Sequence, residues 1–267
     1  MIPTSAASAD ALARCAAARR RVAAMSHRAN SAHLGSSLSC IEIVDAVFTH
    51  SDLSPQTAAS QNRDRIVFSK GHAAMAWYSL LEQHGMLDGA KLDVYLQSGT
   101  TLWGHVTLTK DVPAIDASSG SLGHGLPLAV GFALGHRLRK QDHGVYCILS
   151  DGECDEGSTW EAAMFAGARK LERLTAIIDY NHIQSLAATR DVMDLEPFGD
   201  KWRAFGWTAI EVDGHDEDAL LAALDAPRDG KPLVVLAHTV KGKGIPRIEN
   251  TVASHYKPAL ASDLSEA

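Results

Sequence analysis

Two polar residues, Asp151 and Asn181, stand where they could share a divalent cation. Each lies just past a short apolar stretch with the composition of a buried strand, Val145–Leu149 and Leu174–Asp179. If the two strands are parallel neighbours, both side chains reach the rim where open α/β folds bind ligands. A carboxylate, an amide oxygen and a loop carbonyl form a hard oxygen set that suits Mg2+ or Ca2+ and leaves positions for phosphate oxygens. Gly152 lets the backbone approach such a ligand closely.

The residues between the two strands predict a helix. Ser158-Thr159-Trp160-Glu161 has the S-x-x-E form of a capping box, which marks a helix start. Apolar residues at three- and four-residue spacing then predict one buried stripe, formed by Trp160, Ala163, Met164, Gly167 and Leu171. A strand–helix–strand unit closes as a right-handed parallel crossover, which would bring Asp151 and Asn181 to one edge. Taken singly, however, Asp151-Gly152 is better explained as a turn and Asn181 as a loop residue.

This stretch resembles a known family. Asp151-Gly152-Glu153 through Tyr180-Asn181 resembles the thiamine diphosphate motif, and the run from Cys154 to Ala166 is similar to transketolases in particular. The resemblance implies thiamine diphosphate and Mg2+ (or Ca2+) as cofactors. It implies that the metal is held by Asp151, Asn181 and the backbone carbonyl of Ile183, and that Gly152, Glu153 and Asn181 contact the cofactor.

Four histidines lie in segments that resemble transketolase loops. His33 and His105 resemble the histidines that face the sugar substrate, so the resemblance implies catalytic roles for both. His72 begins a predicted helix and resembles the histidine that touches the diphosphate, where a helix N-terminus favours an anion. His255 resembles a histidine that contacts both diphosphate and substrate. Without the family, a lone loop histidine is usually just solvated, and a helix cap explains His72 equally well.

Two further segments imply cofactor contacts by resemblance. The Gly/Ser loop over residues 117–125 would place Ser121 and Leu122 against the cofactor rings, and Val240 would pack against the pyrimidine. Taken alone, the Lys-Gly-Lys-Gly run after Val240 is more often a solvated basic loop than a phosphate site. The chain also departs from the family pattern: Val106 replaces a proline, His124 a glutamine, Ser185-Leu186-Ala187 an Ile-Asp-Gly run, and Tyr256 a glycine.

Strands and helices alternate along the whole chain, which predicts an α/β fold with a doubly wound parallel sheet in a single domain over residues 1–267. Further strands are predicted at Arg65–Ser69, Trp207–Val212 and Leu233–Ala237, and helices at Ala7–Met25, Cys40–Phe48, Glu196–Phe205 and Glu217–Leu224. The first helix is rich in alanine and arginine like a transit peptide. An early acid and late arginines nevertheless match a helix dipole.

Composition excludes several classes of function. A net charge of −7 argues against general nucleic-acid or anionic-membrane binding. Apolar runs such as Leu126–Leu134 are too short to span a bilayer. The four cysteines, Cys15, Cys40, Cys147 and Cys154, show no metal-ligand spacing, which is typical of a reducing cytoplasm.

The resemblance covers only the diphosphate-binding domain of transketolase. The pyrimidine-binding and C-terminal domains are missing, which is the pattern of split transketolases. The resemblance therefore implies a partner subunit that carries both domains, two copies of each chain, and sugar or sugar-phosphate substrates between which a two-carbon ketol unit is transferred. In the family the glutamate that activates the cofactor lies on the pyrimidine domain, and Glu156 by resemblance lies near it at the subunit interface.

Two other interpretations stay open at this point. The chain could belong to a related thiamine-dependent enzyme, such as the α subunit of a 2-oxo-acid dehydrogenase or a deoxyxylulose-phosphate synthase, although the run Trp160–Met164 and the histidines favour transketolase. It could also be a degenerate, non-catalytic partner domain, which would explain the departures. Intact Asp151, Asn181, His72 and His255 argue against that second possibility.

Overall fold

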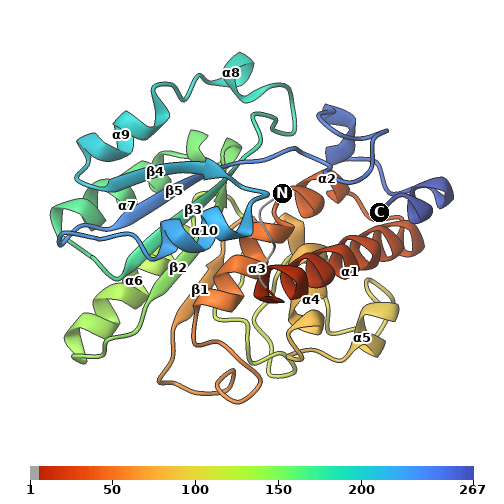
Figure 1. Ribbon diagram of the computed structural model, residues 1–267, viewed down its shortest axis with the longest axis horizontal. Helices are drawn as coiled ribbons and strands as arrows, with labels where there is room; N and C mark the ends of the chain where they lie inside the picture. Colours follow the sequence, from red (N-terminus) through yellow and green to blue (C-terminus); the bar gives the residue numbers. More distant parts are fainter. Residues whose placement is uncertain (1–5) are drawn as a thin grey trace.

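A five-stranded sheet forms the centre of the computed structural model, which describes residues 6–267 (Figure 1). Its strands are β1 (Arg65–Phe68), β2 (Val145–Ser150), β3 (Leu174–Tyr180), β4 (Thr208–Asp213) and β5 (Leu233–His238), in the order β1-β2-β3-β5-β4. All neighbouring strands run parallel. The prediction of an α/β fold is therefore confirmed, and the first five residues of the predicted domain lie outside the described residues.

The central strands are buried on both faces. Every position of β3, and nearly every position of β2 and β5, is buried, which explains why these strands are continuous apolar runs in the sequence. Because successive side chains point to opposite faces of a sheet, each strand contributes to two cores. In β2, Tyr146 and Ile148 belong to one core, and Cys147 and Leu149 belong to the other.

Helices cover both faces of the sheet (Figure 1). One core includes residues of α1 (Ala6–Ala29), α3 (Ile41–His50), α4 (Ala74–Gln83) and α10 (Glu217–Leu224). The other includes residues of α6 (Gly125–Leu138), α7 (Gly157–Ala168) and α9 (Phe198–Ala204). The short helices are α2 (Leu34–Ser39), α5 (Gly89–Asp93) and α8 (Thr189–Val192), and 3-10 turns span Gly71–Ala73, Gly152–Asp155, Val252–His255 and Ala261–Ser265. Within residues 6–267, none of the helices has the length and hydropathy of a membrane span.

The strand–helix–strand unit predicted around α7 is present. β2 and β3 are parallel neighbours, paired from Val145 opposite Leu174 to Ser150 opposite Asp179. Two details of the predicted helix are wrong. α7 begins before Ser158, whose hydroxyl donates to the Gly123 carbonyl at 2.8 Å instead of capping the helix. Met164 is 53% exposed, because the buried face of α7 consists of Thr159, Ala162, Ala163 and Ala166.

Other predicted boundaries shift by short distances. The helix predicted from Glu196 begins at Phe198, because the Glu196 carboxylate accepts the Phe198 N–H at 2.8 Å and so lies before the helix. The segment that contains His72 forms a 3-10 turn before α4 begins at Ala74. The predicted first helix extends to Ala29. None of these shifts moves a predicted site residue away from the end of its strand.

Candidate functional site

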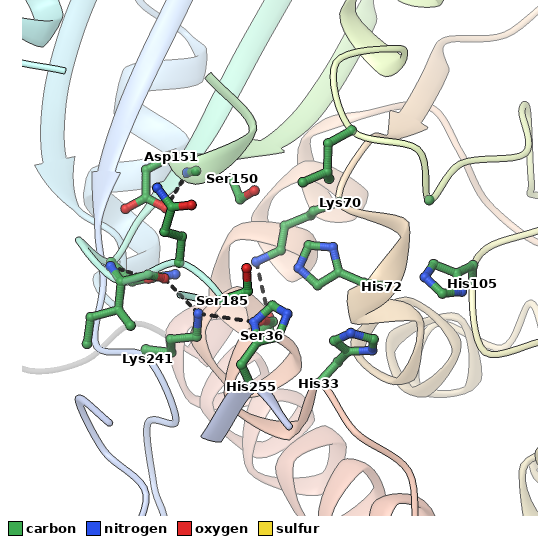
Figure 2. A pocket seen from close by; sticks show the side chains of 16 residues that line it. His33, Ser36, Lys70, His72, His105, Ser150, Asp151, Ser185, Lys241 and His255 are labelled. Atoms are coloured by element: carbon green, nitrogen blue, oxygen red, sulfur yellow. Dashed lines mark hydrogen bonds between the residues drawn. The ribbon is translucent and has the colours of Figure 1, made fainter. Parts of the chain in front are cut away.

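A cavity of about 200 Å³ lies at the carboxyl ends of β2 and β3 (Figure 2). The turns after β1, β2 and β3, the segment after β5 and loops that carry histidines all contribute to its walls. The cavity brings together these predicted site residues: His33, His72, His105, Leu122, Asp151, Gly152, Asn181, Ile183 and His255. It therefore lies at the rim that the strand pattern indicates for ligand binding.

Asp151 and Asn181 are held side by side at this rim. The Asp151 N–H donates to the Asp179 carbonyl at 3.2 Å, so the pairing of β2 with β3 continues past the last strand residue. The Asp151 carboxylate accepts the N–H of His182 at 2.6 Å, directly after Asn181, and that of Gly152 at 2.8 Å. Both Asp151 and Asn181 are buried. The carboxylate and the amide thus share one edge.

The Asp151 carboxylate lacks a cationic partner within the described residues. Its hydrogen bonds come from the two backbone N–H groups and from the Thr189 hydroxyl at 3.2 Å, all of which are neutral. Burial raises the pKa of Asp151 to about 6, and the neighbouring Asp179 carboxylate acts in the same direction. A nearby cation stabilises the ionised form of a buried carboxylate. The oxygen ligands at the rim therefore fit a divalent metal ion.

Two lysines line the same cavity. Lys70 is fully buried, pairs with Asp179 and donates to the Ser36 carbonyl at 3.0 Å. Lys241 is 2% exposed, and its Nζ donates to the Ile183 carbonyl at 2.6 Å and lies 3.4 Å from His255 Nδ1. Burial lowers the pKa of Lys241 to about 8.

Among the described residues, neither Asp151 nor Lys241 therefore has an oppositely charged group among its hydrogen-bond partners. Within the described part of the chain, the contacts of Lys241 are to neutral acceptors, whereas Asp151 has neutral donors. A divalent cation bound to a diphosphate would supply both missing partners. The Ile183 carbonyl, predicted as a metal ligand, has a second lone pair besides the one that Lys241 uses. The residues at the rim thus fit the metal and diphosphate of the cofactor.

The four predicted histidines form one cluster beside the lysines (Figure 2). The ring centroid of His33 lies 5.3 Å from that of His72, 5.8 Å from His105 and 4.9 Å from His255. Burial lowers the pKa of His33 to about 4 and that of His255 to about 3, and neighbouring imidazole and ammonium groups act in the same direction. Burial also lowers the pKa of His72. These three rings are neutral at pH 7, so each can donate one hydrogen bond without adding charge.

Close backbone contacts fix the cluster. The His33 N–H donates to the His255 carbonyl at 2.7 Å, and a Cβ on Gly35 would lie 2.2 Å from Ser254 Oγ, so α2 can approach this segment only with glycine there. Gly120 has a φ of 138° and passes beneath His105, where a Cβ would lie 2.8 Å from the imidazole. The absence of a side chain at Gly35 and at Gly120 thus lets each histidine loop pack closely against the adjoining segment.

Four predicted site residues do not line the cavity. The buried Glu153 carboxylate accepts hydrogen bonds from the Ser69 hydroxyl and, at 2.9 Å, from the Gly123 N–H, so it ties the Gly/Ser loop to the turn after β1. Glu156 and Ser121 are exposed. Val240 borders an adjoining cavity, and its N–H donates to His215 Nε2 at 2.8 Å.

Other lining residues were not among the predicted site residues: Ser36, Lys70, Gly120, Ser150, Gln184, Ser185 and Lys241. Lys70 could have been found from its place in the same strand-to-helix turn as His72. Lys241 belongs to the run that would be solvated if taken alone, and its burial shows otherwise. Its position directly after β5, on the ligand rim, was the available signal.

Comparison with known proteins gives a consistent result. The family model "Transketolase, thiamine diphosphate binding domain" matches residues 13–267. The chain is 42% identical over 226 residues to the 6-deoxy-6-sulfo-D-fructose transketolase subunit SqwG of Clostridium sp. (strain MSTE9), covering 84% of this chain and 82% of that protein. It is 36% identical to an apulose-4-phosphate transketolase subunit of Phocaeicola vulgatus, covering 93% and 89%. The chain belongs to the transketolase family.

Solved transketolase structures share the fold. The transketolase of Campylobacter jejuni superposes with a TM-score of 0.87 at 28% identity, over 96% of this chain and 41% of that one. The chain thus spans less than half of these longer transketolases. Two predictions are confirmed: the transketolase diphosphate domain and thiamine diphosphate as its cofactor. Membership in this family favours transketolase over the other thiamine-dependent enzymes that the sequence left open.

Proposed function

We propose that the chain is the diphosphate-binding subunit of a split transketolase, which transfers a two-carbon ketol unit from a ketose to an aldose. The observation that carries the proposal is the rim itself, where Asp151 has neutral donors instead of a cation and Lys241 neutral acceptors instead of an anion. The relatives support a subunit role, since the two proteins of which the chain covers 82% and 89% are both named as transketolase subunits.

The rim residues would hold the cofactor by its charged end. Asp151, Asn181 and the Ile183 carbonyl would bind the divalent cation, and Lys241, His72 and His255 would contact the diphosphate. Gly152 and Leu122 also line the cavity and would contact the cofactor there. When bound, thiamine diphosphate supplies the carbon nucleophile and electron sink that ketol transfer needs.

Three of the clustered histidines would act on the sugar. His33, His105 and His255 would donate hydrogen bonds to substrate hydroxyls and to the oxygen on which negative charge develops. The ring centroid of His33 lies 5.8 Å from that of His105 and 4.9 Å from that of His255, which supports this role, since one small substrate could contact all three. Because donors that are already held in place need no reorganisation when charge develops, they stabilise the transition state more than the ground state.

The partner subunit would complete the site with the pyrimidine-binding and C-terminal domains. Exposed apolar side chains stand next to cavity residues: Trp103 (55% exposed) near His105, Leu186 (73%) after Ser185 and Tyr256 (56%) after His255. Large exposed apolar residues around a cavity mouth indicate a protein surface that is covered in the assembly. Glu156 is exposed as well and would meet the partner there.

We propose that two copies of each chain assemble, with this subunit contacting its own copy through α6 and α7. Gly131 and Gly135 lie on α6 with nothing within 4 Å of a Cβ at either position, so no contact among the described residues requires glycine there. Exposed apolar residues accompany them: Leu128, Leu138, Met164 and Phe165. Glycines one helical turn apart allow two helix backbones to approach closely, as a second copy would do.

The substrates are proposed only as a class, a sugar or sugar phosphate. The two relatives named above act on different sugars according to their names, a sulfosugar and apulose 4-phosphate. A cytoplasmic location is likewise a proposal, and it agrees with four free cysteines.

Ketol-transfer assays test the proposal. The chain by itself, its partner by itself and a mixture of both would be assayed with thiamine diphosphate, Mg2+ and a panel of ketose donors. We expect activity from the mixture alone. Full activity from the isolated chain would overturn the split arrangement, and pyruvate decarboxylation by the mixture would favour a 2-oxo-acid dehydrogenase instead.

A further inference from the structure

Asp179 is a buried carboxylate that no predicted role includes. It lies in β3 two residues before Asn181 and is fully buried. Its Oδ2 accepts hydrogen bonds from the Ser39 hydroxyl at 2.6 Å, from Asn181 Nδ2 at 3.3 Å and from the Lys70 ammonium. Its Oδ1 accepts one from the Thr239 hydroxyl. One carboxylate therefore contacts four side chains behind the metal-binding edge.

These contacts determine how the Asn181 amide is turned. A carboxylate paired with an ammonium ion can only accept, so the group that faces Asp179 must be the Asn181 NH2. On the other side, the Ile183 N–H can only donate, and it meets Asn181 Oδ1 at 3.1 Å. The two partners together exclude the flipped amide. The oxygen of Asn181 is thereby directed away from Asp179 and toward the turn that carries Ile183.

The same carboxylate joins three segments of the rim. Ser39 ends α2, which begins next to His33; Lys70 follows β1; and Thr239 follows β5, two residues before Lys241. All three donate to Asp179. Asp179 thus holds the ends of β1, β3 and β5 and the end of α2 around one point, and each of these segments contributes a residue to the cavity.

We infer that Asp179 is a positioning residue for the metal site. It orients the Asn181 amide oxygen toward the cation, and it holds the Lys70 ammonium next to its own carboxylate. The inference rests on the proposed metal set of Asp151, Asn181 and the Ile183 carbonyl. Partners behind metal ligands that fix ligand orientation typically change metal affinity 10–100-fold when they are mutated.

The test measures metal affinity directly. Mn2+ binding to the full chain, with saturating thiamine diphosphate and the partner subunit present, would be followed through the water proton relaxation rate, which reports protein-bound Mn2+. In Asp179→Asn, the new amide can offer an NH2 group to Asn181, so the Ile183 N–H is the one remaining contact that opposes the flipped Asn181 amide. We expect Mn2+ affinity to fall about 10–100-fold. Ser39→Ala is the matched control, because it removes a donor to the same Oδ2 but leaves both Asn181 contacts, and it should bind Mn2+ like wild type.

A second variant separates orientation from charge. Asp179→Asn leaves Lys70 buried without its partner, which can destabilise the fold, and it also removes a negative charge near the cation. Asp179→Asn combined with Lys70→Met removes both charges of the pair, so the local net charge is unchanged. Thiamine diphosphate would be titrated first, so that it is saturating for every variant. We expect the double variant to melt near the wild-type temperature without cofactor and still to lose Mn2+ affinity about 10–100-fold.

The outcomes are distinguishable. Wild-type Mn2+ affinity in both Asp179 variants would overturn the positioning role. The positioning role would also be overturned if Asp179→Asn lost Mn2+ affinity and the charge-balanced double variant regained it, because the effect would then be electrostatic. Asp151→Ala serves as the reference. If wild type itself bound no Mn2+ in the presence of cofactor and partner, the proposed metal site would fail, whichever result the Asp179 variants gave.

Discussion

Two buried carboxylates, Asp45 in α3 and Asp151 after β2, have very different hydrogen-bond partners. Asp45, in α3, is fully buried and accepts hydrogen bonds from Arg14 at 2.8 Å and from His84 at 2.7 Å. Burial alone would raise the pKa of Asp45, but these hydrogen bonds outweigh it and hold the pKa below its ordinary value. Asp151 is buried equally well but has neutral donors, and its pKa is raised to about 6.

The difference separates an acid that serves the fold from one that serves a ligand. Asp45 has a cation within the chain, Arg14, so its charge is compensated in the absence of any ligand. Asp151 has no cation among its hydrogen-bond donors in the described residues, and the nearby charge of Lys241 offsets its burial only in part, so a bound metal ion would stabilise its ionised form further. Perturbed acids of this second kind cluster at functional sites. Four predictions test the contrast.

The largest effect is expected at Asp151. Asp151→Ala removes the only proposed carboxylate ligand of the cation, so metal-dependent binding of thiamine diphosphate should be abolished. Without cofactor the melting temperature should change little, because the loss of a buried charge is offset by the loss of the acceptor for the Gly152 and His182 N–H groups. Calorimetry with partner, Mg2+ and cofactor would measure the first effect and thermal melting the second. Equal cofactor affinity in wild type and variant would defeat the metal assignment.

Asp45→Asn should show the opposite behaviour. The substitution removes the buried charge that pairs with Arg14, whose side chain is 25% exposed, and this should lower the free energy of unfolding by about 2 kcal/mol. Cofactor affinity of the folded protein should be unchanged, because Asp45 lies in α3 and does not line the cavity. Urea unfolding followed by circular dichroism gives the stability. A large loss of cofactor affinity in the folded variant would show that the two regions are coupled.

His33→Ala extends the comparison to a residue that should affect only turnover. Its imidazole is neutral and is a proposed hydrogen-bond donor to the sugar, so its loss should lower kcat on the order of 10²–10³-fold. Cofactor binding should remain intact, since the proposed metal ligands are untouched. Calorimetry and steady-state kinetics on the same preparation would separate the two. A comparable loss of cofactor affinity would place His33 with the diphosphate contacts instead.

The rim was predictable from the sequence because it depends on strand ends. Two apolar runs with polar residues after them suffice to place Asp151 and Asn181 together, since parallel strands share a carboxyl edge. The family resemblance added the histidines. Asp179 could not be identified in this way, because it lies inside an apolar run and its partners Ser39, Lys70 and Thr239 come from distant segments.

Local sequence patterns gave wrong predictions at positions where folding brings a different contact partner close. The S-x-x-E pattern at Ser158 predicts a cap, but the Gly123 carbonyl takes the serine hydroxyl. Met164 fits the helical period of a buried stripe, yet it faces outward, because the small residues Ala162, Ala163 and Ala166 pack α7 onto the sheet. Glu153 stands beside the metal-binding aspartate in sequence and points to Ser69 and Gly123 in the fold.

The smallest effect is expected at Glu217, which lies near the ion pair of Arg14 with Asp45 and tests whether Arg14 also compensates a second acid. Glu217 begins α10 and lies 3.8 Å from Arg14, whose shorter contacts are to Asp45. Burial raises the pKa of Glu217 to about 7 from an ordinary value of 4.5, and the Asp45 charge acts in the same direction. Because the folded protein holds this proton more tightly than the unfolded chain, its stabilising effect is present at low pH and is lost as the pH rises through about 7.

Glu217→Gln should therefore match the melting temperature of wild type below about pH 4.5, exceed it increasingly as the pH rises from 4.5 to about 7, and exceed it by a constant amount above that. The N-terminus of α10 favours the anion and opposes this trend, so the gain should be modest. Asp218→Asn, at the next and more exposed position, is the matched control and should leave the pH profile of wild type unchanged. If the two variants gave parallel profiles, Arg14 would compensate Glu217 as well as Asp45, and the contrast between paired and unpaired acids would then apply to the rim alone.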